Sequence, residues 1–407
     1  MKLQNIILVN DAAHINGGAG KVAISSAIGL TKRGYHVILF SAIGPIDDNL
    51  TKNGVEVICL RQFDILTDPS RLRAIRQGIW NTKAEKEFIR LLEKYNPENT
   101  IIHFHGWTKA ISPILFRVTA HTSFRVIITL HEFFTSCPNG GFFNYQRKEI
   151  CERIPMSLSC LLCNCDARSY PQKVWRLFRQ YIQNLFLVKN HRLAFISISQ
   201  LCEDINRKNL KSFSAQWYKL NNPVELNKQS IIDINNNSSY LFIARLSYEK
   251  GADLFCQAIT DLGLKGIVLG DGYQRKELQI KYPNIIFTGW VDGKQKEEYI
   301  HQAKGMVLTS RWYETFGLVV TEMKSYGIPC IVPDRCAAAE QIVDGKTGYI
   351  FNTGDLNSLK ECLIRYEQSD PTDLQRAIIS TFKYEDYTIE THIDNLLEIY
   401  NDFIQKK

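Results

Sequence analysis

Short apolar runs alternate with amphipathic stretches along the first part of the chain. The run NIILVN at 5–10 precedes a glycine-rich turn at 16–21, a helical pattern at 22–34 and a second apolar run at 35–40. Parallel strands need a crossover helix and are covered on both faces, so this order predicts a β–α–β unit. Further strand-length runs extend the predicted parallel sheet, and they lie at 100–106, 125–131 and 193–199.

The alternation begins again after a polar, turn-rich stretch at 221–239. Strand-length apolar runs in this part are separated by helical patterns, which predicts a second doubly wound sheet in tandem with the first. These runs lie at 240–246, 266–270, 284–289, 305–310 and 326–332.

The pattern divides the chain into two Rossmann-like α/β domains and a terminal helix. We expect the first domain over 1–221, the second over 222–385, and a helix at 386–407 that packs back toward the first domain. A length of 407 residues suits two domains of common size. Open α/β sheets bind ligands outside the carboxyl ends of their strands, so the two domains are expected to face each other across a cleft.

The stretch SRWYETFGLVVTEMKSYGIPCIV at 310–332 contains two carboxylates where a strand–helix connection would normally be apolar. Glu314 is expected in a loop at the sheet edge, and Glu322 in the body of the helix that follows. Backbone N–H groups at the start of that helix can bind phosphate while the carboxylates accept hydrogen bonds from hydroxyl groups. On spacing alone, a loop acid and a solvated helix acid explain the pattern equally well.

Turns at the neighbouring strand ends favour the phosphate-binding interpretation. ARLSYEKG puts Arg245 at one strand end and Lys250 five residues later, and two cations so placed can clamp a diphosphate. The turns LGDGYQR, which contains Asp271, and TGWVDG follow the next two strands. All these ends line one edge of one predicted sheet.

Together with DGKTGYIF at 344–351, these segments resemble the nucleotide-sugar domain of the retaining GT-B glycosyltransferases of family 4, whose E-x7-E element corresponds to Glu314 and Glu322. The resemblance covers nearly all of 240–352. It implies a GT-B fold, a nucleoside-diphosphate-sugar donor and no cofactor for catalysis, since cations and a helix start stabilise the leaving diphosphate. The donor-binding residues that it implies are Gly17, Gly18, Arg245, Lys250, Asp271, Trp290, Val291, Phe316, Gly317, Leu318, Val319 and Glu322.

The resemblance also implies a role for the main groups. Arg245 and Lys250 would hold the diphosphate, and Glu322 would hold the ribose. Glu314, together with the backbone at 316–319, would hold the transferred sugar.

Two further pairs complete the implied donor site. Trp290 and Val291 would flank the base. Gly17 and Gly18, in NGGAG, would let the backbone of the first domain approach the donor phosphates closely. Taken alone, these glycines would equally form an ordinary tight turn, and they complete neither a P-loop nor a dinucleotide fingerprint.

His105 and His131 each follow a predicted strand of the first domain. A histidine at such a place is more often structural, but the resemblance favours His131, in TLHEFF, as a catalytic-site residue that contacts the donor sugar or the acceptor. His105 is the second choice, and Glu314 completes the catalytic set. The family often has Asp where this chain has Glu132, which leaves the role of that residue open. The resemblance implies retention of the anomeric configuration, and no carboxylate is an obvious nucleophile. The mechanism inferred is therefore front-face, in which the leaving phosphate helps to deprotonate the acceptor.

A cysteine-rich insert at 137–166 holds five of the 11 cysteines of the chain. An odd number of cysteines in so long a chain does not indicate a disulfide framework. Four thiolates could hold a structural zinc, with Cys137, Cys151, Cys160 and Cys163 favoured and Cys165 as the spare. The alternative is a set of free thiols in a loop that binds the acceptor.

The segment 169–192 contains five basic residues and no acid. Its apolar residues Val174, Leu177, Tyr181, Leu185 and Val188 recur at helical spacing. A basic amphipathic helix suits an anionic membrane surface that carries a lipid-linked acceptor. A helix that packs on the core and exposes a solvated basic face explains the same pattern.

Composition narrows the class of protein. Hydrophobic residues make up 45% and charged residues 22%, which is typical of a globular protein, and the net charge of +7 suits phosphate-bearing ligands without indicating nucleic acid. No apolar stretch approaches the roughly 18–20 residues that span a bilayer. We therefore expect a cytoplasmic protein, with peripheral contact to the inner face of the plasma membrane as the membrane option.

The function predicted first is transfer of one sugar to a growing glycan or lipid-linked acceptor in surface polysaccharide or lipopolysaccharide synthesis. Alternatives on the same fold are a nucleotide-sugar epimerase or phosphorylase, and an inactive binding scaffold. The cysteine insert favours an acceptor region over an epimerase, and an intact set of donor residues argues against a scaffold. A dehydrogenase is disfavoured because Phe40 and Ser41 stand where an acid would bind the ribose.

Overall fold

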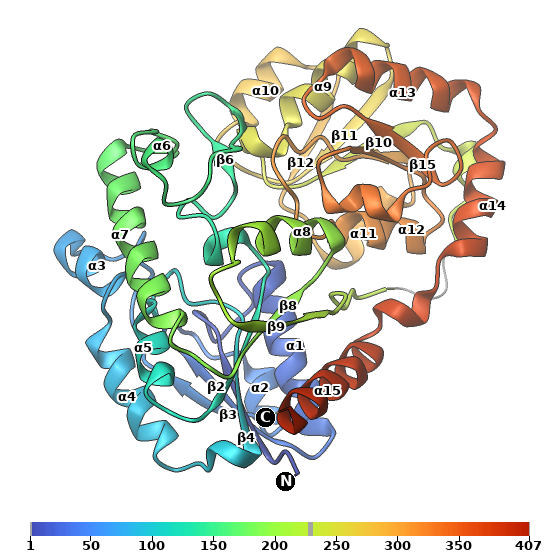
Figure 1. The fold of residues 1–407 in the computed structure, drawn as a ribbon. Coiled ribbons are helices and arrows are strands. Elements are labelled where there is room, and N and C mark those ends of the chain that lie inside the picture. The colour runs from blue at the N-terminus through green and yellow to red at the C-terminus, as the bar shows by residue number, and fades with distance from the viewer. Residues whose placement is uncertain (1, 227–230, 407) are drawn as a thin grey trace. The chain divides into compact units, whose positions relative to one another are not determined.

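The computed structural model describes residues 2–226 and 231–406. The chain forms two compact units, each built on a parallel sheet (Figure 1). The first unit consists of Met1–Gly141, Arg153–Pro223 and Thr388–Lys407, and the second of Phe142–Glu152 and Val224–Tyr387.

The short segment Phe142–Glu152 is grouped with the second unit, whereas the sequence placed the whole cysteine-rich insert in the first. It forms a hairpin of β6 (Phe143–Asn144) and β7 (Glu149–Ile150). Lys148 lies over the ring of Tyr248 at 4.4 Å, and Glu152 pairs with Arg335 at 3.1 Å. Such contacts between residues far apart in the chain carry no signal in the local sequence.

Seven parallel strands form the sheet of the first unit, in the order β3-β2-β1-β4-β5-β8-β9. The strands β4, β5 and β8 are buried at every position, as expected where helices cover both faces. The strand bounds are β1 (Asn5–Val9), β2 (His36–Ser41), β3 (Glu56–Cys59), β4 (Thr100–Phe104), β5 (Arg125–Thr129), β8 (Leu193–Ser197) and β9 (Ala215–Lys219).

The five strands predicted for this sheet are confirmed as β1, β2, β4, β5 and β8. Sequence reasoning missed β3 and β9, which lie at the two edges of the sheet and are only partly buried. Edge strands lack the continuous apolar run that a strand between two helical layers requires.

Helices cover the sheet of the first unit. On one face, α1 packs against α15, and the close approach of Ile393 to Gly29 leaves no room for a larger residue there, because an added Cβ would lie 2.6 Å from Ile393. Among the other helices, α5 packs against α4 and α7. The helix bounds are α1 (Gly18–Lys32), α2 (Asp48–Lys52), α3 (Arg71–Gln77), α4 (Thr82–Leu92), α5 (Ile114–Ala120), α6 (Leu158–Leu161), α7 (Tyr170–Leu187), α8 (Gln200–Asn209) and α15 (Ile389–Gln405).

The second unit contains a six-stranded sheet in the order β12-β11-β10-β13-β14-β15. All its strand pairs are parallel, so its carboxyl ends meet at one edge, and the strand order reverses between β10 and β13. In doubly wound sheets this reversal marks the ligand site. The strand bounds are β10 (Ser239–Ile243), β11 (Lys265–Leu269), β12 (Ile286–Gly289), β13 (Ala303–Val307), β14 (Cys330–Pro333) and β15 (Gly348–Phe351).

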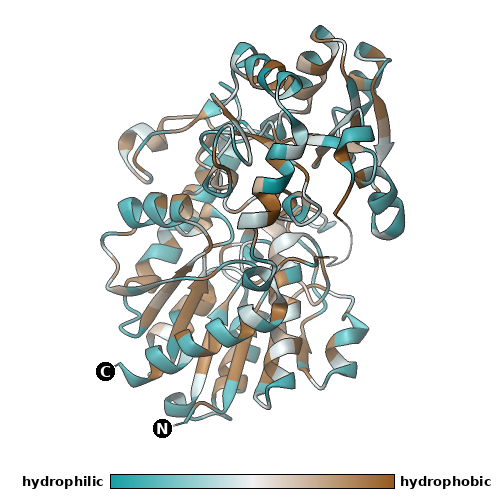
Figure 2. Ribbon diagram, turned by 90° about the vertical axis from the view of Figure 1, so that its right-hand side faces the viewer, coloured by the Kyte–Doolittle hydropathy of each residue, from teal (hydrophilic) through white to brown (hydrophobic). Residues whose placement is uncertain are grey.

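Two apolar clusters, one on each face of this sheet, form the core of the second unit. The strands of both sheets are hydrophobic along much of their length, whereas many helices show hydrophilic residues on one side (Figure 2). The helix bounds are α9 (Ala252–Asp261), α10 (Arg275–Lys281), α11 (Gly293–Ile300), α12 (Leu318–Ser325), α13 (Leu356–Gln368) and α14 (Pro371–Thr381).

The C-terminal helix α15 packs on the first unit, as the sequence predicted. Ile393, Leu396 and Tyr400 are buried in the same apolar cluster as residues of β1 and α1. The described helices include none that is both long and apolar enough to span a bilayer.

We expect Leu396→Ala to lower the free energy of unfolding by about 2–5 kcal/mol, because it leaves a cavity under α15. Urea denaturation measures the change. Glu398→Ala, at an exposed position on the same helix, is the matched control and should change stability little. Equal effects of the two substitutions would show that α15 does not stabilise the first unit.

Candidate functional site

The loop after β13 and the start of α12 form the centre of the candidate site in the second unit. Gly317 is the N-cap of α12 and has a left-handed φ of 84°, and an added Cβ would lie 2.8 Å from the Cβ of Ala338. Glycine is therefore required for the turn into the helix. The backbone N–H groups of the first residues after it, Leu318 and Val319, belong to the open end of the helix.

Glu314 lies in this loop as an ionised, mostly buried carboxylate. Its Oε1 pairs with Nζ of Lys250 and accepts a hydrogen bond of 2.7 Å from the hydroxyl of Ser310. Burial raises the pKa of Glu314, but Lys250 and the Ser310 hydroxyl outweigh that effect, so the pKa lies below its usual value. The carboxylate is thus a charged acceptor at the edge of the sheet.

Glu322, on α12, pairs with Lys296 of α11. Nζ of Lys296 lies 2.5 Å and 2.6 Å from the two carboxylate oxygens. Each glutamate of the E-x7-E element is therefore held by its own lysine. Lys296 was missed by sequence reasoning, because in the run GKQKEEY it has the appearance of one more solvated charge on a helix.

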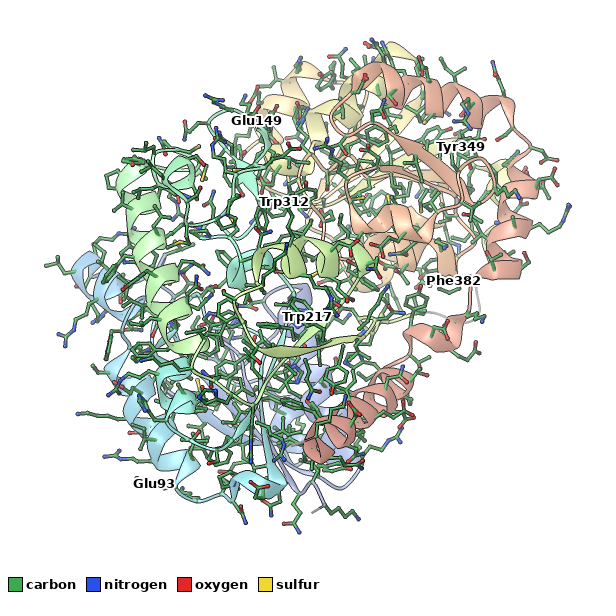
Figure 3. All side chains as sticks on the ribbon, in the orientation of Figure 1. Glu93, Glu149, Trp217, Trp312, Tyr349 and Phe382 are labelled. Atoms are coloured by element: carbon green, nitrogen blue, oxygen red, sulfur yellow. The ribbon has the colours of Figure 1, made fainter. Side chains whose placement is uncertain are left out.

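Lys250 reaches Glu314 because the turn that precedes α9 lies very close to the loop after β13. Gly251 has a left-handed φ of 73°, and an added Cβ would lie 2.0 Å from the carbonyl oxygen of Thr309. Lys250 also lies over the indole of Trp312 at 5.0 Å, and Trp312 is labelled in Figure 3. The lysine is thus fixed by both a charge and an aromatic ring.

Arg245, the second predicted cation, extends from the carboxyl end of β10. Its Nη2 donates to Glu249 at 2.8 Å, and the same carboxylate oxygen accepts from the hydroxyl of Ser247 at 2.7 Å. Glu249 is buried, whereas the Arg245 side chain is 64% exposed. The guanidinium is anchored at one edge and open to an incoming anion at the other.

The remaining donor-side residues differ in exposure. Asp271 accepts a hydrogen bond of 3.0 Å from Arg275 on α10, four residues later, so the structure gives it a partner within its own turn. Trp290 is 75% exposed, which leaves its ring open for stacking. Val291 lies in the loop after β12 and the buried Phe316 in the loop before α12, and both are apolar.

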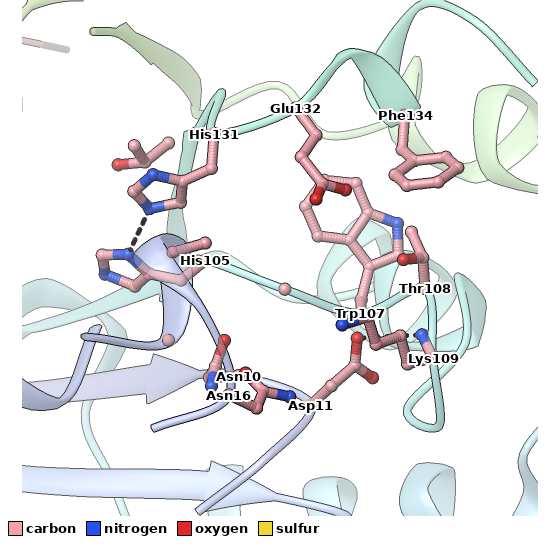
Figure 4. A pocket seen from close by; sticks show the side chains of 14 residues that line it. Asn10, Asp11, Asn16, His105, Trp107, Thr108, Lys109, His131, Glu132 and Phe134 are labelled. Carbon is pink, nitrogen blue, oxygen red and sulfur yellow. Dashed lines mark hydrogen bonds between the residues drawn. The ribbon is translucent and has the colours of Figure 1, made fainter. Parts of the chain in front are cut away.

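A pocket in the first unit lies where the carboxyl ends of β1, β4 and β5 meet the start of α1 (Figure 4). His105 and His131 stand on one side of it, and Trp107, Glu132 and Phe134 on the other. The lining residues are Asn10, Asp11, Asn16, Ala19, Gly20, His105, Gly106, Trp107, Thr108, Lys109, Thr129, His131, Glu132 and Phe134.

The structure brings the two predicted histidines together. Nδ1 of His105 and Nε2 of His131 share a hydrogen bond of 2.9 Å. Burial lowers the pKa of His131 to about 3 and holds the pKa of His105 well below its usual value. Both rings are therefore neutral at neutral pH and act as hydrogen-bonding groups rather than as cations.

Behind this pair, a buried network links the pocket to the C-terminal helix. His103 bonds Tyr400 of α15 at 2.6 Å through Nδ1 and Thr129 at 2.7 Å through Nε2. The ring of His103 also packs on His105, with centroids 4.2 Å apart. Neither His103 nor Tyr400 was selected from the sequence.

Two other features shape the pocket. The carboxylate of Asp11 accepts backbone N–H bonds of 2.8–2.9 Å from Lys109, Ala110 and Ile111 and so fixes the loop after β4. Gly17 is the N-cap of α1 with a φ of 131°, and Gly18 is the first residue of that helix. Their neighbours Asn16, Ala19 and Gly20 line the pocket, whereas the two predicted glycines stand just outside its lining.

The cysteine-rich insert surrounds a buried lysine. Lys173, on α7, donates to Sγ of Cys160 at 3.4 Å and is fully buried. Burial lowers the pKa of Lys173, and the thiols of Cys165, Cys160 and Cys137 raise it, with a net increase above its usual value. The lysine contact thus involves Cys165, predicted as the spare, rather than Cys163.

The structure contains no disulfide among the described cysteines. Within residues 2–226 and 231–406, no three histidine, cysteine, aspartate or glutamate side chains are grouped so that they could hold a metal ion. Cys151 belongs to the second unit, whereas Cys137, Cys160 and Cys163 belong to the first. The zinc site with these four ligands therefore stays a prediction from the sequence.

Comparison with known proteins finds a family that the second unit resembles. Residues 225–383 match the model of the glycosyl transferases group 1. An uncharacterized 41.2 kDa protein in the cps region of Klebsiella pneumoniae is 32% identical over 126 residues, which cover 30% of this chain and 35% of that protein. A GDP-mannose-dependent alpha-mannosyltransferase of Mycobacterium tuberculosis is 31% identical over 114 residues, 28% of this chain and 30% of that enzyme.

These matched segments span about a third of the length of the two relatives. A longer match, to an uncharacterized 42.6 kDa protein in the cps region of Klebsiella pneumoniae, is 25% identical over 334 residues and covers 78% of this chain and 82% of that protein.

Solved structures share the fold over almost the whole chain. A glycosyltransferase from Rickettsia africae superimposes with a TM-score of 0.68 at 16% identity, with full coverage of both chains. Anabaena HepE in complex with UDP-glucose gives 0.62 at 15% identity, covering 98% of this chain and 99% of that one. WaaG, a glycosyltransferase involved in lipopolysaccharide biosynthesis, gives 0.62 at 14% identity, covering 99% and 100%.

We expect the free energy of unfolding to fall as the pH is lowered from about 7 toward 4. Burial lowers the pKa of His103, His105, His131 and His392 in the folded protein, so the unfolded chain binds protons below about pH 6.5 that the folded chain does not bind. The loss is up to about 1.4 kcal/mol per pH unit for each histidine. Urea denaturation at several pH values measures the slope. His392→Gln should reduce the slope, and His121→Gln, at an exposed position, should not.

If the sequence-based zinc prediction holds, purified protein should contain zinc near one atom per chain. Metal analysis by mass spectrometry measures it. Cys160→Ser should remove the metal, whereas Cys256→Ser, a buried cysteine of the second unit, should not. Protein without zinc or iron near that stoichiometry would rule out the metal site.

Proposed function

We propose that the protein is a retaining glycosyltransferase, because residues 225–383 match the model of the glycosyl transferases group 1. It moves a sugar from a nucleoside-diphosphate sugar to a hydroxyl group of a glycan or lipid-linked acceptor. The observation that carries this proposal is the pair of carboxylates on either side of the start of α12, each held by a lysine.

The donor diphosphate binds at the carboxyl edge of the second sheet. Arg245 supplies a planar fork that is already anchored on Glu249, and Lys250 supplies a point charge beside it. The open N–H groups at the start of α12 add hydrogen bonds to the same anion or to the sugar. These fixed positive groups stabilise the diphosphate as it leaves, which is the part of the reaction where negative charge develops.

The two glutamates accept hydrogen bonds from the hydroxyl groups of the donor. Glu322 holds the ribose and Glu314 the transferred sugar. In the free protein their charges are balanced by Lys296 and Lys250. Lys250 has three N–H donors, so it can bind the diphosphate and stay paired with Glu314, while the remaining lone pairs of Glu314 accept hydrogen bonds from sugar hydroxyls.

The acceptor hydroxyl binds at the pocket of the first unit. His131 and His105 are neutral, so they can accept or donate a hydrogen bond to a hydroxyl without attracting the negative diphosphate. No carboxylate is given the role of nucleophile. The acceptor attacks from the face on which the diphosphate leaves, and the leaving phosphate takes the proton of the acceptor hydroxyl.

The similar proteins support a particular class of acceptor. Two relatives are proteins in cps regions, and one structural neighbour acts in lipopolysaccharide biosynthesis. A lipid-linked glycan of the cell surface, elongated at the cytoplasmic face of the plasma membrane by a peripheral enzyme, is the acceptor that we propose on this basis.

We expect at least one sugar nucleotide, among UDP-, GDP- and other nucleoside-diphosphate sugars, to raise the melting temperature of the wild type. Glu322→Ala should weaken binding of that donor by at least tenfold, about 1.4 kcal/mol, because the ribose loses a charged hydrogen-bond acceptor. Thermal shift and calorimetric titration measure the change. Glu361→Ala, an exposed glutamate on α13, is the matched control. The proposal is wrong if no sugar nucleotide stabilises the wild type, or if Glu322→Ala binds the donor as well as Glu361→Ala does.

A further inference from the structure

The outward face of α7 carries an apolar stripe. Its members recur every three or four residues, so they lie on one side of the helix. Their side chains are between 37% and 54% exposed, and they are Tyr170, Val174, Phe178, Tyr181, Leu185 and Val188.

The orientation of α7 is the reverse of that expected for an ordinary surface helix. Lys173 and Arg179, two of the five basic residues of 169–192, are buried, whereas most of the apolar residues at helical spacing are exposed. Only Leu177 of that apolar set is buried. A helix that buries cations needs polar partners on its inner side, and its exposed aliphatic and aromatic residues favour an apolar partner on its outer side.

Two neighbouring helices add further exposed apolar side chains beside the stripe. Trp175 of α7 donates to the carbonyl oxygen of Ile75 on α3 at 3.0 Å, and Tyr170 donates to that of Leu161 on α6 at 2.9 Å. These contacts put α3, α6 and α7 side by side on the left of Figure 1. We call this surface the α3–α6–α7 face; besides the stripe it consists of Leu72, Ile75, Ile154, Leu158, Leu161 and Leu162, all exposed.

The α3–α6–α7 face is exceptional within the molecule. Half of the large apolar side chains that are exposed among the described residues lie on it. Single exposed apolar residues are common on protein surfaces, but so many on three adjoining helices indicate an interaction site.

Positive charge surrounds this apolar surface. Arg71, Arg73 and Arg76 are exposed on α3, and Arg168 and Lys189 are exposed near the two ends of α7. Acidic residues are few. Asp68, just before α3, pairs with Arg73 at 2.7 Å, and α3 itself contains no acid. The only acid between 153 and 192 is Asp166, which is buried and pairs with Arg176 at 2.9 Å. The rim is therefore basic, which disfavours a partner that is itself basic.

We propose that the α3–α6–α7 face binds an anionic phospholipid bilayer. Apolar side chains on short helices reach the boundary between headgroups and acyl chains, and the basic rim pairs with lipid phosphates. Charge selects this occupant over a second copy of the chain. Two copies of the face would bring Arg71, Arg76 and the basic ends of α7 together, and the one acid beside α3, Asp68, is already paired with Arg73.

The position of the face relative to the pocket connects it to the proposed function, on which this inference rests. The opposite side of α7 holds the pocket wall: Arg179 donates to the carbonyl oxygen of Thr108 at 3.0 Å, and Gln180 and Gln183 donate to that of Thr135 at 2.8 and 3.1 Å. Only the thickness of one helix, about 10 Å, lies between the pocket wall and the bilayer surface. An acceptor anchored in the bilayer by its lipid can therefore present its sugar to the pocket.

The test is flotation of the full chain with vesicles. The wild type should bind vesicles of phosphatidylcholine and phosphatidylglycerol and should bind pure phosphatidylcholine much more weakly. Leu158→Ser with Leu162→Ser, and separately Phe178→Ser with Tyr181→Ser, should reduce partitioning into anionic vesicles by roughly tenfold or more, because exposed apolar groups no longer enter the interface. Ile280→Ser with Ile364→Ser, two exposed isoleucines of the second unit, is the matched control and should bind like the wild type.

A charge variant separates the two contributions. Arg71→Glu with Arg76→Glu should abolish the preference for anionic over neutral vesicles, and added salt should weaken the wild type in the same way. If the wild type does not float with anionic vesicles, or if the apolar variants float as well as the control, the proposal is overturned. It is also overturned if light scattering shows a wild-type dimer that the apolar variants convert to a monomer while vesicle binding is absent.

Donor binding distinguishes a failure of this inference from a failure of the proposed function. The apolar variants lie outside the donor site and should retain the thermal shift given by the sugar nucleotide. Vesicle binding without any donor binding would reject the proposed function alone, and donor binding without vesicle binding would reject the membrane face alone.

Discussion

The ion pair between Lys250 and Glu314 is the interaction on which the donor edge of the second unit depends. A buried carboxylate must be paired, and Lys250 can pair with it only if the turn after β10 lies against the loop after β13. Gly251 makes this possible, because any side chain at that position would collide with the carbonyl oxygen of Thr309. One pair of charges thus holds together two strand ends on either side of the point where the strand order reverses. Lys250 and Gly251 are therefore both needed for the ion pair with Glu314.

The first unit also buries polar side chains at its strand ends, but these side chains are neutral. At the carboxyl ends of β4 and β5, histidines occupy buried positions, with His105 bonded to His131 through Nδ1 and His103 bonded to Thr129 and Tyr400. Neutral imidazoles are less costly to bury than ions, and they keep both donor and acceptor capacity. The second unit therefore concentrates cations and carboxylates, which suit a diphosphate and its sugar hydroxyls. The histidine pair of the first unit offers hydrogen bonds without a charge of its own, which suits an uncharged hydroxyl.

The sequence was sufficient to predict the two parallel sheets, the terminal helix and the places of Glu314, Glu322, Arg245 and Lys250, because these depend on local periodicity and on turns at strand ends. It did not reveal Lys296 as the partner of Glu322, since a lysine among charged neighbours on a helix resembles any solvated residue. The hairpin at 142–152 was placed in the wrong unit for the same reason: its contacts join segments about 100 or more residues apart. What local pattern cannot predict is which of several charged residues meets a partner from elsewhere in the chain.

The helix α7 is the clearest case in which the local sequence does not predict which charged residues find buried partners. Read as a sequence, its lysine and arginines belong on the surface and its aliphatic residues in the core. The structure places Lys173 against Cys160 and Arg179 against the pocket loop at Thr108, because those interior groups are polar and need donors. Leu177, Ile182 and Leu187 share this inner face and are buried, whereas the apolar residues of the stripe lie on the outer side of the helix. An amphipathic helix inverted in this way has a polar site on one side, and the free energy of its exposed apolar side chains decreases if the other side contacts a medium less polar than water.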